Sequence, residues 1–349
     1  MRISEAQPLW ESAGVYCNTA SYGLPPKPAW DALQSALADW HSGRTSWEQW
    51  GQSTEGARAV FARLVGVGAE RVAVGSTVSE LIGSAVTALP QGARVVVPDI
   101  EFTSTLFPLL VQQRLDVRTV PPAQLVDAIA DGVDAVAFSA VQMSTGEVAD
   151  LDAIVAAAAS IGAITICDAT QAVGWLPIDA ARFDALVCGA YKWLMSPRGS
   201  AFLAVSDRLL ERAVPHSAGW YAGEDVHASY FGPPLRLASS ARRLDLSPAW
   251  FSWVGTQPAL KLIERIGIDA IHDHDLALAN RFRAGVGLEP SNSAIVCADI
   301  PGAAERLERA GIIAAVRGGL LRTSWHLYND ESDVDEVLGV IQERAARPY

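Results

Sequence analysis

The sequence predicts an α/β protein with a mainly parallel sheet in a large domain and a smaller α+β domain after it. Between about residues 56 and 205, short runs of β-branched and other apolar residues alternate with alanine-rich helical segments. The chain has 349 residues, of which 50% are hydrophobic. Such a chain can form a large core, and its length indicates two domains rather than one. Beyond residue 256 the pattern changes to helices and three short strands.

Seven apolar runs in the first part of the chain have the length and composition of buried strands. They cover residues 71–74, 94–98, 117–120, 135–139, 164–168, 185–188 and 201–205. Helical segments are expected between them over residues 80–89, 104–113, 124–130 and 152–160. Because strands joined by crossover helices run parallel, this order indicates one large sheet covered by helices on both faces.

The second part of the chain follows a loop-rich stretch, residues 216–248. We expect a long helix to start near Pro258 and to run past Ile266, and a closing helix whose early Asp333 and Asp335 suit its N-terminal dipole. Three strands are expected over residues 293–298, 313–315 and 320–324, and the closing helix over 332–346. We therefore divide the chain into an N-terminal segment that contributes to the active site, 1–25, a large domain, 26–255, and a small domain, 256–349.

Composition argues against several classes of partner. The formal net charge is −12 and no basic cluster is present, which disfavours nucleic acid. No apolar run approaches the roughly 18 residues of a membrane span, so we expect a cytoplasmic protein. The 4 cysteines are scattered without a CxxC pair and are interpreted as reduced thiols. His272 and His274 are interpreted as solvated surface residues, and no metal site is predicted.

Two charged residues follow buried strands, where parallel sheets bind their ligands. Asp168 ends one apolar run, and an isolated carboxylate there is costly without a cationic partner such as a pyridinium nitrogen. Its alternative role is to cap the next helix. Lys192 follows the next strand, where desolvation would lower its pKa toward the neutral amine that attacks an aldehyde. Alone, such a lysine is more often a solvated strand end.

Taken together, Asp168-Ala-Thr-Gln171 and Tyr191-Lys192 resemble the class-V aminotransferase, cysteine desulfurase and kynureninase group of fold-type-I pyridoxal-phosphate (PLP) enzymes. The resemblance implies PLP as the cofactor, carried by Lys192 as a Schiff base. Asp168 would then pair with the pyridine nitrogen, Gln171 would bond the ring hydroxyl, and the Tyr191 hydroxyl would reach the cofactor phosphate.

Further motifs extend the resemblance over nearly the whole chain. Gly75-Ser76-Thr77-Val78 ends a strand and opens a helix, which suits a phosphate, although such turns are usually ordinary caps. The resemblance implies that Phe102 stacks on the cofactor ring, although a phenylalanine there is more often core. It implies that Ser247 in Asp-Leu-Ser-Pro reaches the phosphate of a neighbouring subunit, and hence a homodimer with shared active sites.

The resemblance also implies which residues bind the substrate, and they come from the two ends of the chain. Arg322 in Arg-Thr-Ser-Trp-His-Leu-Tyr-Asn matches the family's arginine that binds the substrate's α-carboxylate. Asn18, Ala20 and Tyr22 match a substrate-entry strand that faces the site.

The reaction is narrowed by a missing cysteine. Desulfurases need a nucleophilic cysteine before the carboxylate arginine, and residues 307–321 contain none. Met143 stands where desulfurases have asparagine, which leaves Gln142 as a substitute contact. The Asn-Thr-Ala-Ser-Tyr-Gly-Leu-Pro, Ala-Tyr-Lys-Trp-Leu and Arg-Thr-Ser-Trp-His-Leu-Tyr-Asn segments resemble the carbon-sulfur lyases of actinobacterial ergothioneine biosynthesis. This implies β-elimination from hercynylcysteine sulfoxide. The alternatives are an aminotransferase, a selenocysteine lyase and a kynureninase-like enzyme.

The sequence contains 11 tryptophans, several of them in loops expected at the mouth of the active site. Aromatic walls attract a quaternary ammonium group, and Trp220 is our candidate for substrate binding. Packing at a dimer interface is an equally good explanation for these residues. The tryptophans concerned are Trp40, Trp47, Trp50, Trp193, Trp220, Trp250, Trp253 and Trp325.

Overall fold

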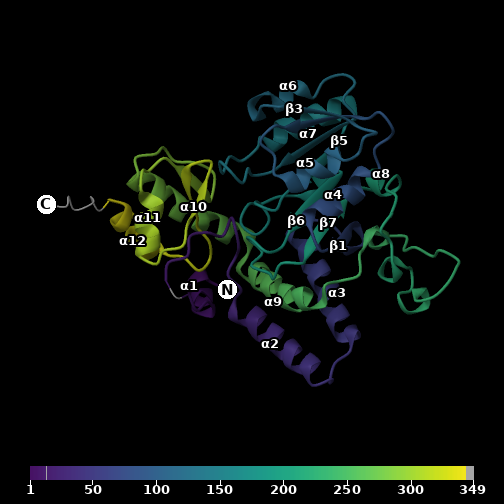
Figure 1. Ribbon diagram of the computed structural model, residues 1–349, viewed down its shortest axis with the longest axis horizontal. Coiled ribbons are helices and arrows are strands. Elements are labelled where there is room, and N and C mark those ends of the chain that lie inside the picture. The colour runs from purple at the N-terminus through teal and green to yellow at the C-terminus, as the bar shows by residue number, and fades with distance from the viewer. Residues whose placement is uncertain (13, 343–349) are drawn as a thin grey trace.

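The computed structural model describes residues 1–12 and 14–342 and contains a large and a small β-sheet (Figure 1). The large sheet has 7 strands in the order β1-β7-β6-β5-β4-β2-β3. Neighbours among β2 to β6 run parallel, and only β7 runs antiparallel to its neighbours. The predicted α/β fold with a mainly parallel sheet is confirmed. Its strands are β1 (Val72–Gly75), β2 (Arg94–Pro98), β3 (Asp116–Val120), β4 (Ala135–Ser139), β5 (Ile164–Asp168), β6 (Ala185–Gly189) and β7 (Ala201–Val205).

Helices surround the large sheet and continue into the C-terminal part of the chain (Figure 1). The long helix α9 packs against α2 and α3. The α-helices are α1 (Ile3–Ala6), α2 (Lys27–His41), α3 (Trp47–Leu64), α4 (Val78–Val86), α5 (Thr103–Leu110), α6 (Leu125–Ala128), α7 (Leu151–Ile161), α8 (Asp207–Leu210), α9 (Trp250–Ile266), α10 (Ile268–Gly285), α11 (Ala303–Arg309) and α12 (Glu331–Gln342).

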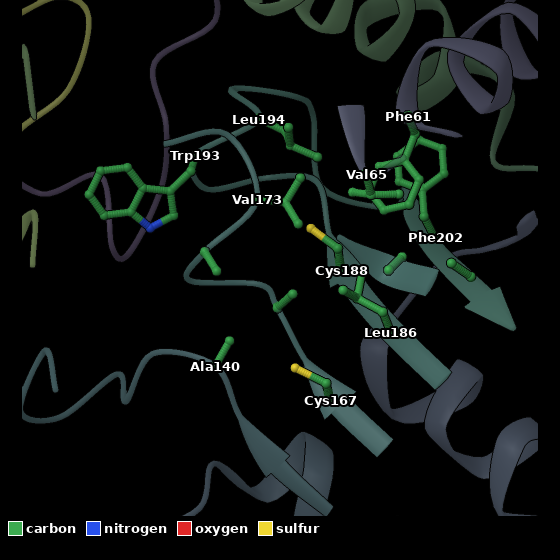
Figure 2. Close-up of a cluster of buried hydrophobic side chains, with 14 of the residues drawn as sticks. Phe61, Val65, Ala140, Cys167, Val173, Leu186, Cys188, Trp193, Leu194 and Phe202 are labelled. Atoms are coloured by element: carbon green, nitrogen blue, oxygen red, sulfur yellow. The ribbon is translucent and has the colours of Figure 1, made fainter. Parts of the chain in front are cut away.

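The strands β4 to β7 are buried on both faces, so alternate residues enter two different apolar layers. Cys167 and Leu186 point into the layer that also contains Phe61 and Phe202 (Figure 2). Their neighbours Ile166 and Val187 enter the layer on the other face. The rings of Phe61 and Phe202 stack with centroids 4.1 Å apart and join α3 to β7. Burial of both faces explains why the strands appear in the sequence as uninterrupted apolar runs.

The small sheet contains β8 (Ile295–Ala298), β10 (Leu320–Ser324) and β9 (Ala315–Arg317), in that order and antiparallel. The expected strand over 313–315 overlaps β9 only at Ala315. Ile313 pairs instead with the N-terminal segment, since its N–H donates to the Val15 carbonyl and its carbonyl accepts from the Cys17 N–H. The N-terminal segment thereby joins the small sheet. The three-part division at residues 25 and 255 stays a proposal.

One helix prediction needs correction. The long helix α9 starts at Trp250, contains Pro258 in its interior and ends at Ile266, whereas we expected it to start near Pro258. Proline is usual in the first turn because it removes an internal hydrogen bond elsewhere in a helix. Gly267, with φ +94°, separates α9 from α10. The closing helix α12 covers Glu331–Gln342, in agreement with the prediction, and residues 343–346 of the expected helix lie outside the described residues.

His272 and His274 also differ from expectation, because both are partly buried in α10 rather than on a solvated segment. His272 stacks on Trp175, and a ring nitrogen of His274 lies 3.1 Å from the Asn329 carbonyl oxygen. Within residues 1–12 and 14–342, no group of three or more histidine, cysteine, aspartate or glutamate side chains is placed to hold a metal ion. No helix in this described part of the chain has the length and apolarity needed to cross a membrane.

Candidate active site

A cleft opens where the parallel strands of the large sheet end, and the space inside it together with the solvent at its mouth measures about 590 Å³. Its lining comes from the segments after β1, β2, β4, β5 and β6, whose carboxyl ends share one edge of the sheet. The lining residues are Ser76, Thr77, Val78, Phe102, Ser104, Ser139, Val141, Met143, Asp168, Thr170, Gln171, Gly189, Tyr191, Lys192, Arg198 and Ser200.

Asp168 stands at the end of β5 and is 6% exposed. One carboxylate oxygen accepts from the Thr170 N–H at 2.9 Å, and the other accepts from the Thr105 hydroxyl at 2.9 Å. These donors stabilise a negative charge in an apolar surrounding and fix the plane of the carboxylate. Such a carboxylate can pair with a cationic ring nitrogen in the cleft.

Lys192 lies in the loop after β6 and is 6% exposed. Burial lowers the pKa of its ammonium group to about 8, while the charge of Asp168 opposes the shift and that of Arg322 adds to it. The neutral amine, which attacks an aldehyde, is therefore far more abundant near neutral pH than for a lysine with the ordinary pKa of 10.5.

The backbone around Lys192 is tightly enclosed. A Cβ atom on Gly23 would come within 2.0 Å of the Lys192 carbonyl oxygen, and one on Gly174 would come within 2.6 Å of the Trp193 oxygen. Met195 adopts φ +51°, which is uncommon for a residue other than glycine. Two glycines thus allow neighbouring segments to hold the lysine loop in place.

The expected phosphate end of the cleft is the start of α4. Ser76, Thr77 and Val78 line the cleft, and Thr77 caps the helix by accepting from the Glu80 N–H. The Glu80 carboxylate accepts in turn from the Ser76 N–H at 3.1 Å. The next amides belong to the first turn of α4, whose N–H groups have no partner within a helix. These amides suit a phosphate, whereas the Ser76 amide becomes available only when Glu80 turns away.

Arg322, on β10, is 1% exposed, yet its guanidinium has few partners. It donates to the Met143 carbonyl at 2.8 Å and to the Ser21 hydroxyl at 2.7 Å, while its buried Nε has no partner among the described residues. Burial lowers its pKa to about 10. Since this buried cation faces no carboxylate of the described chain, it suits an incoming anion.

The N-terminal segment lies between Arg322 and the cleft. The Ala20 N–H donates to the Ser324 hydroxyl, and the Ala20 carbonyl accepts from the Gln171 side chain. Asn18 pairs with Ser324, and its buried Oδ1 has no partner among the described residues. Tyr22 is 46% exposed and packs on Tyr191 with ring centroids 5.3 Å apart.

Gln171 and Phe102 line the cleft as expected, with differences in detail. The Gln171 amide is held at both ends, since it donates to Ala20 and accepts from the Trp193 indole at 2.8 Å. Phe102 is 40% exposed, and the Lys192 ammonium lies 5.8 Å from its ring centroid. Gln142, the expected substitute contact, instead donates to Glu101.

Six predicted site residues do not line the cleft of their own chain: Arg322, Asn18, Ala20 and Tyr22, whose contacts are given above, and also Ser247 and Trp220. Ser247 is exposed at the end of a turn whose Asp245 is buried against Arg58. Trp220 packs against Trp47 and Trp250. The predicted roles of Ser247 and Trp220 require the cleft of a second copy of the chain. Trp193, Trp253 and Trp325 are fully buried, so our expectation that they stand at the mouth of the site is wrong.

The structure adds three residues to which the sequence analysis gave no role. Thr105 donates to Asp168, and Arg198 lines the cleft and donates to the Tyr22 hydroxyl at 3.0 Å. Glu101 is buried, accepts from Ser139 and Gln142, and has a pKa raised mainly by burial. The position of Glu101 shortly after β2 could have identified it as a site residue, because ligands bind beyond the carboxyl ends of parallel strands. Thr105 and Arg198 have no such signal, because their partners are distant in sequence.

The donor set fits the cofactor that the sequence led us to expect. The cleft combines a buried lysine of lowered pKa, a hydrogen-bonded carboxylate, an aromatic ring and a helix N-terminus. Lys192 would hold PLP covalently, Asp168 would pair with its ring nitrogen, and the start of α4 would receive its phosphate. These sites match the aldehyde, the pyridine and the phosphate of one molecule.

The site and sheet define a PLP enzyme of the α/β class, and comparisons with known proteins agree. Residues 25–299 match the family described as Aminotransferase class-V. The chain is 28% identical to the uncharacterized aminotransferase YcbU of Bacillus subtilis, over 87% of this chain and 86% of that protein. It is 30% identical to the kynureninase of Deinococcus radiodurans, over 77% of this chain and 70% of that protein.

Solved structures give the same fold. A cystine C-S lyase, C-DES, in complex with cysteine persulfide superimposes with a TM-score of 0.85 at 18% identity and covers 95% of this chain and 98% of its own. The apo cysteine desulfurase of Thermococcus onnurineus NA1 superimposes with a TM-score of 0.81 at 21% identity. The match covers 95% of this chain and 94% of the desulfurase. The chain belongs to the class-V aminotransferase family, its fold is that of fold-type-I PLP enzymes, and its cofactor is PLP.

Proposed function

We propose that this protein is a cytoplasmic, homodimeric carbon-sulfur lyase that eliminates the sulfur substituent from a cysteine S-conjugate. The substrate that we favour is hercynylcysteine sulfoxide, which would give ergothioneine, pyruvate and ammonia. Residue roles follow the geometry of the cleft, with Lys192 as cofactor ligand and base, Asp168 on the ring nitrogen and Arg322 on the α-carboxylate.

The burial of the cysteine thiols is the observation that favours elimination rather than persulfide transfer. All 4 cysteines of the sequence lie in the described residues, and none is exposed. Cys17, Cys167 and Cys188 are buried, and burial raises the pKa of each. Cys297 is partly buried and donates to the Ser144 carbonyl at 3.2 Å. A persulfide-forming enzyme needs an accessible thiolate, and no cysteine here has that character.

The proposed elimination depends on how Arg322 and Lys192 are placed around the substrate's Cα. PLP, when bound, stabilises negative charge at the substrate's Cα. Arg322 would fix the α-carboxylate through its unpartnered N–H groups, and the substrate's amino group would replace Lys192 on the cofactor. The released Lys192 amine, with its pKa of about 8, would remove the Cα proton as a general base.

Elimination breaks the bond between Cβ and sulfur, and the electron pair of the Cα–H bond forms the Cα–Cβ double bond. Sulfur leaves as a sulfenic acid after it gains a proton, and two equivalents of an added thiol reduce it to the thione, with release of water and the thiol's disulfide. The remaining three-carbon enamine takes up water and yields pyruvate and ammonia. Tyr191, which lines the cleft, and Tyr22, which packs on Tyr191, are the candidate proton donors.

Aromatic rings at the cleft favour a substrate with a quaternary ammonium group. Phe102 and Tyr191 line the cleft, and Tyr22 packs on Tyr191. The Arg198 guanidinium already lies 5.1 Å from the Tyr191 centroid, and Phe102 is expected to stack on the cofactor ring, which leaves Tyr22 as the available face. Each good cation-π contact contributes roughly 0.5–2 kcal/mol.

A kynureninase-like activity is the second candidate, because a kynureninase is among the relatives at 30% identity. That reaction would release alanine, whereas elimination releases pyruvate. Aminotransferase and selenocysteine lyase activities are excluded by the same assay when pyruvate forms without a keto acid and without selenium.

The test combines a variant with a product assay. The purified protein is incubated with hercynylcysteine sulfoxide, other cysteine S-conjugates, kynurenine and selenocysteine, and pyruvate and alanine are measured. Lys192→Ala should lose the visible absorbance of covalently held PLP and the turnover. Normal turnover by Lys192→Ala would contradict the assignment of the lysine, and alanine as the main product would contradict elimination.

A further inference from the structure

A buried aspartate–histidine pair contacts the backbone next to the active-site lysine. Asp275 of α10 and His326, two residues after β10, are both 0% exposed. His326 Nδ1 lies 2.8 Å from Asp275 Oδ2, and His326 Nε2 lies 3.0 Å from the backbone carbonyl oxygen of Trp193. Neither residue lines the cleft.

The chemistry of these contacts fixes the tautomer of the histidine. A carbonyl oxygen can only accept, so His326 Nε2 must carry the proton that it donates to Trp193. One further proton is shared between Nδ1 and the Asp275 carboxyl group, because only one fits between two facing acceptors. Asp275 therefore anchors Nδ1 and keeps the ring oriented with its Nε2–H toward the Trp193 carbonyl.

The carbonyl that His326 holds belongs to the residue next to Lys192. The Trp193 indole donates to Gln171, whose amide donates to Ala20, so the contact continues into the N-terminal segment. The same lysine loop contains the uncommon backbone of Met195. A strained loop keeps its conformation only where its surroundings hold it.

We infer that Asp275 and His326 form a positioning pair that orients Lys192 relative to Arg322. Arg322 and His326 are separated by three residues at the end of β10, so one segment of the small sheet holds both the expected carboxylate ligand and the backbone of the lysine loop. The role in positioning Lys192 rests on the proposed function, in which Lys192 holds the cofactor.

The experiment uses variants of matched shape in the PLP-loaded protein. His326→Phe removes the donor to Trp193. Asp275→Leu removes the partner that anchors Nδ1 and frees the ring to turn away from Trp193, whereas Asp275→Asn retains a side chain that can hydrogen-bond Nδ1. His326→Gln retains a donor and serves where the phenylalanine variant fails to fold. Arg281→Gln, on the surface of α10 with an ion pair to Asp335, controls for general loss of stability in the small domain.

The first readout is hydrogen exchange of two amides in the lysine loop. The Met195 N–H donates to the Lys192 carbonyl, and the Ser196 N–H donates to the Ala190 carbonyl. In His326→Phe and Asp275→Leu both amides should exchange roughly tenfold faster, as loss of one hydrogen bond implies. Amides of β4 and β5 should not change, and Asp275→Asn should remain near wild type.

The second readout is kinetic. A misplaced lysine amine should lower kcat about tenfold or more while KM changes little, because binding of the carboxylate is unaffected. Unchanged exchange at Met195 and Ser196, or equal acceleration throughout the chain, would overturn the positioning role. Exchange is measured on amides, so it remains informative if Lys192→Ala shows that another residue holds PLP.

Discussion

At the scale of single residues, burial without a partner is the main signal of function. Arg322 is enclosed yet keeps an unpartnered Nε, and Lys192 is enclosed with no carboxylate within ion-pair distance among the described residues. A chain selected for stability alone would pair such groups or replace them with apolar ones. Their ligand is therefore expected to come from outside the chain.

Replacing Arg322 tests the carboxylate ligand. Arg322→Lys keeps the charge but loses the planar fork, so KM for the amino-acid substrate should rise roughly 10- to 100-fold, as for loss of a charged hydrogen bond of about 1.5–3 kcal/mol. The visible spectrum of the PLP-loaded protein should not change. Steady-state kinetics measure the effect, and Arg281→Lys is the control. An unchanged KM would show that another group binds the carboxylate.

The pH dependence of cofactor uptake tests the environment of Lys192. Its pKa is lowered from 10.5 to about 8 by burial, so the reactive neutral amine is gained as pH rises through about 8. The rate of PLP uptake by cofactor-free protein should rise through this pH and then level off. Asp168→Asn should move the inflection to lower pH, because the Asp168 charge raises the pKa of Lys192. Stopped-flow absorbance checks both, and an inflection near 10.5 would contradict the burial effect.

At the scale of elements, loops after strands place the chemistry, and glycines determine how closely they pack. Gly174 has φ +118° and faces the Trp193 carbonyl oxygen, whereas Gly83 inside α4 has open space around it. The same change, glycine to alanine, therefore has opposite expected effects at these two positions.

Gly174→Ala should destabilise the protein by roughly 1–3 kcal/mol, because the new methyl group meets backbone at a strained φ. Gly83→Ala should stabilise it by roughly 0.5–1 kcal/mol, since alanine favours a helix interior. Urea unfolding of both PLP-loaded variants gives the two values. Equal stability of the pair would show that the lysine loop is less tightly enclosed than the structure indicates.

The elements that the sequence predicted well share one physical property. Strands β4 to β7 are buried on both faces and appear as continuous apolar runs between helical segments. The helix around Pro258 was misplaced because tertiary packing of α9 against α2 and α3 outweighs the local preference of proline for a first turn. Asp168 and Lys192 were predictable from their positions after strands, whereas Thr105 and His326 act through contacts with residues far along the chain.

At the scale of the whole molecule, an apolar surface lies beside the cleft. Phe107, Leu110 and Val111, spaced so that they share one face at the end of α5, are 56%, 48% and 71% exposed. Thr103 and Ser104 at the start of the same helix border a hollow that also includes Phe107 and Val111. Exposed apolar patches of this kind commonly mark subunit contacts.

We predict that this surface is part of the proposed homodimer contact. Val111→Glu should shift the protein toward monomer and lower its activity at low protein concentration, because a buried charge without a partner opposes association. Sedimentation velocity over a concentration series measures the shift. Ile313→Glu adds the same charge at an exposed apolar residue of the small domain and should leave the association unchanged. A wild-type protein that is monomeric at all concentrations would contradict the dimer.

The short segment from Arg322 to His326 limits which residues can be changed to alter the substrate specificity. It fixes the lysine loop at one end and the expected carboxylate ligand at the other, so these two points would be shared by every amino acid that the enzyme turns over. Discrimination between side chains then falls to residues that approach the cleft from other segments, and Arg198 is exposed and lines it. Diversifying position 198 would therefore change specificity and leave Lys192, Arg322 and the candidate proton donors untouched.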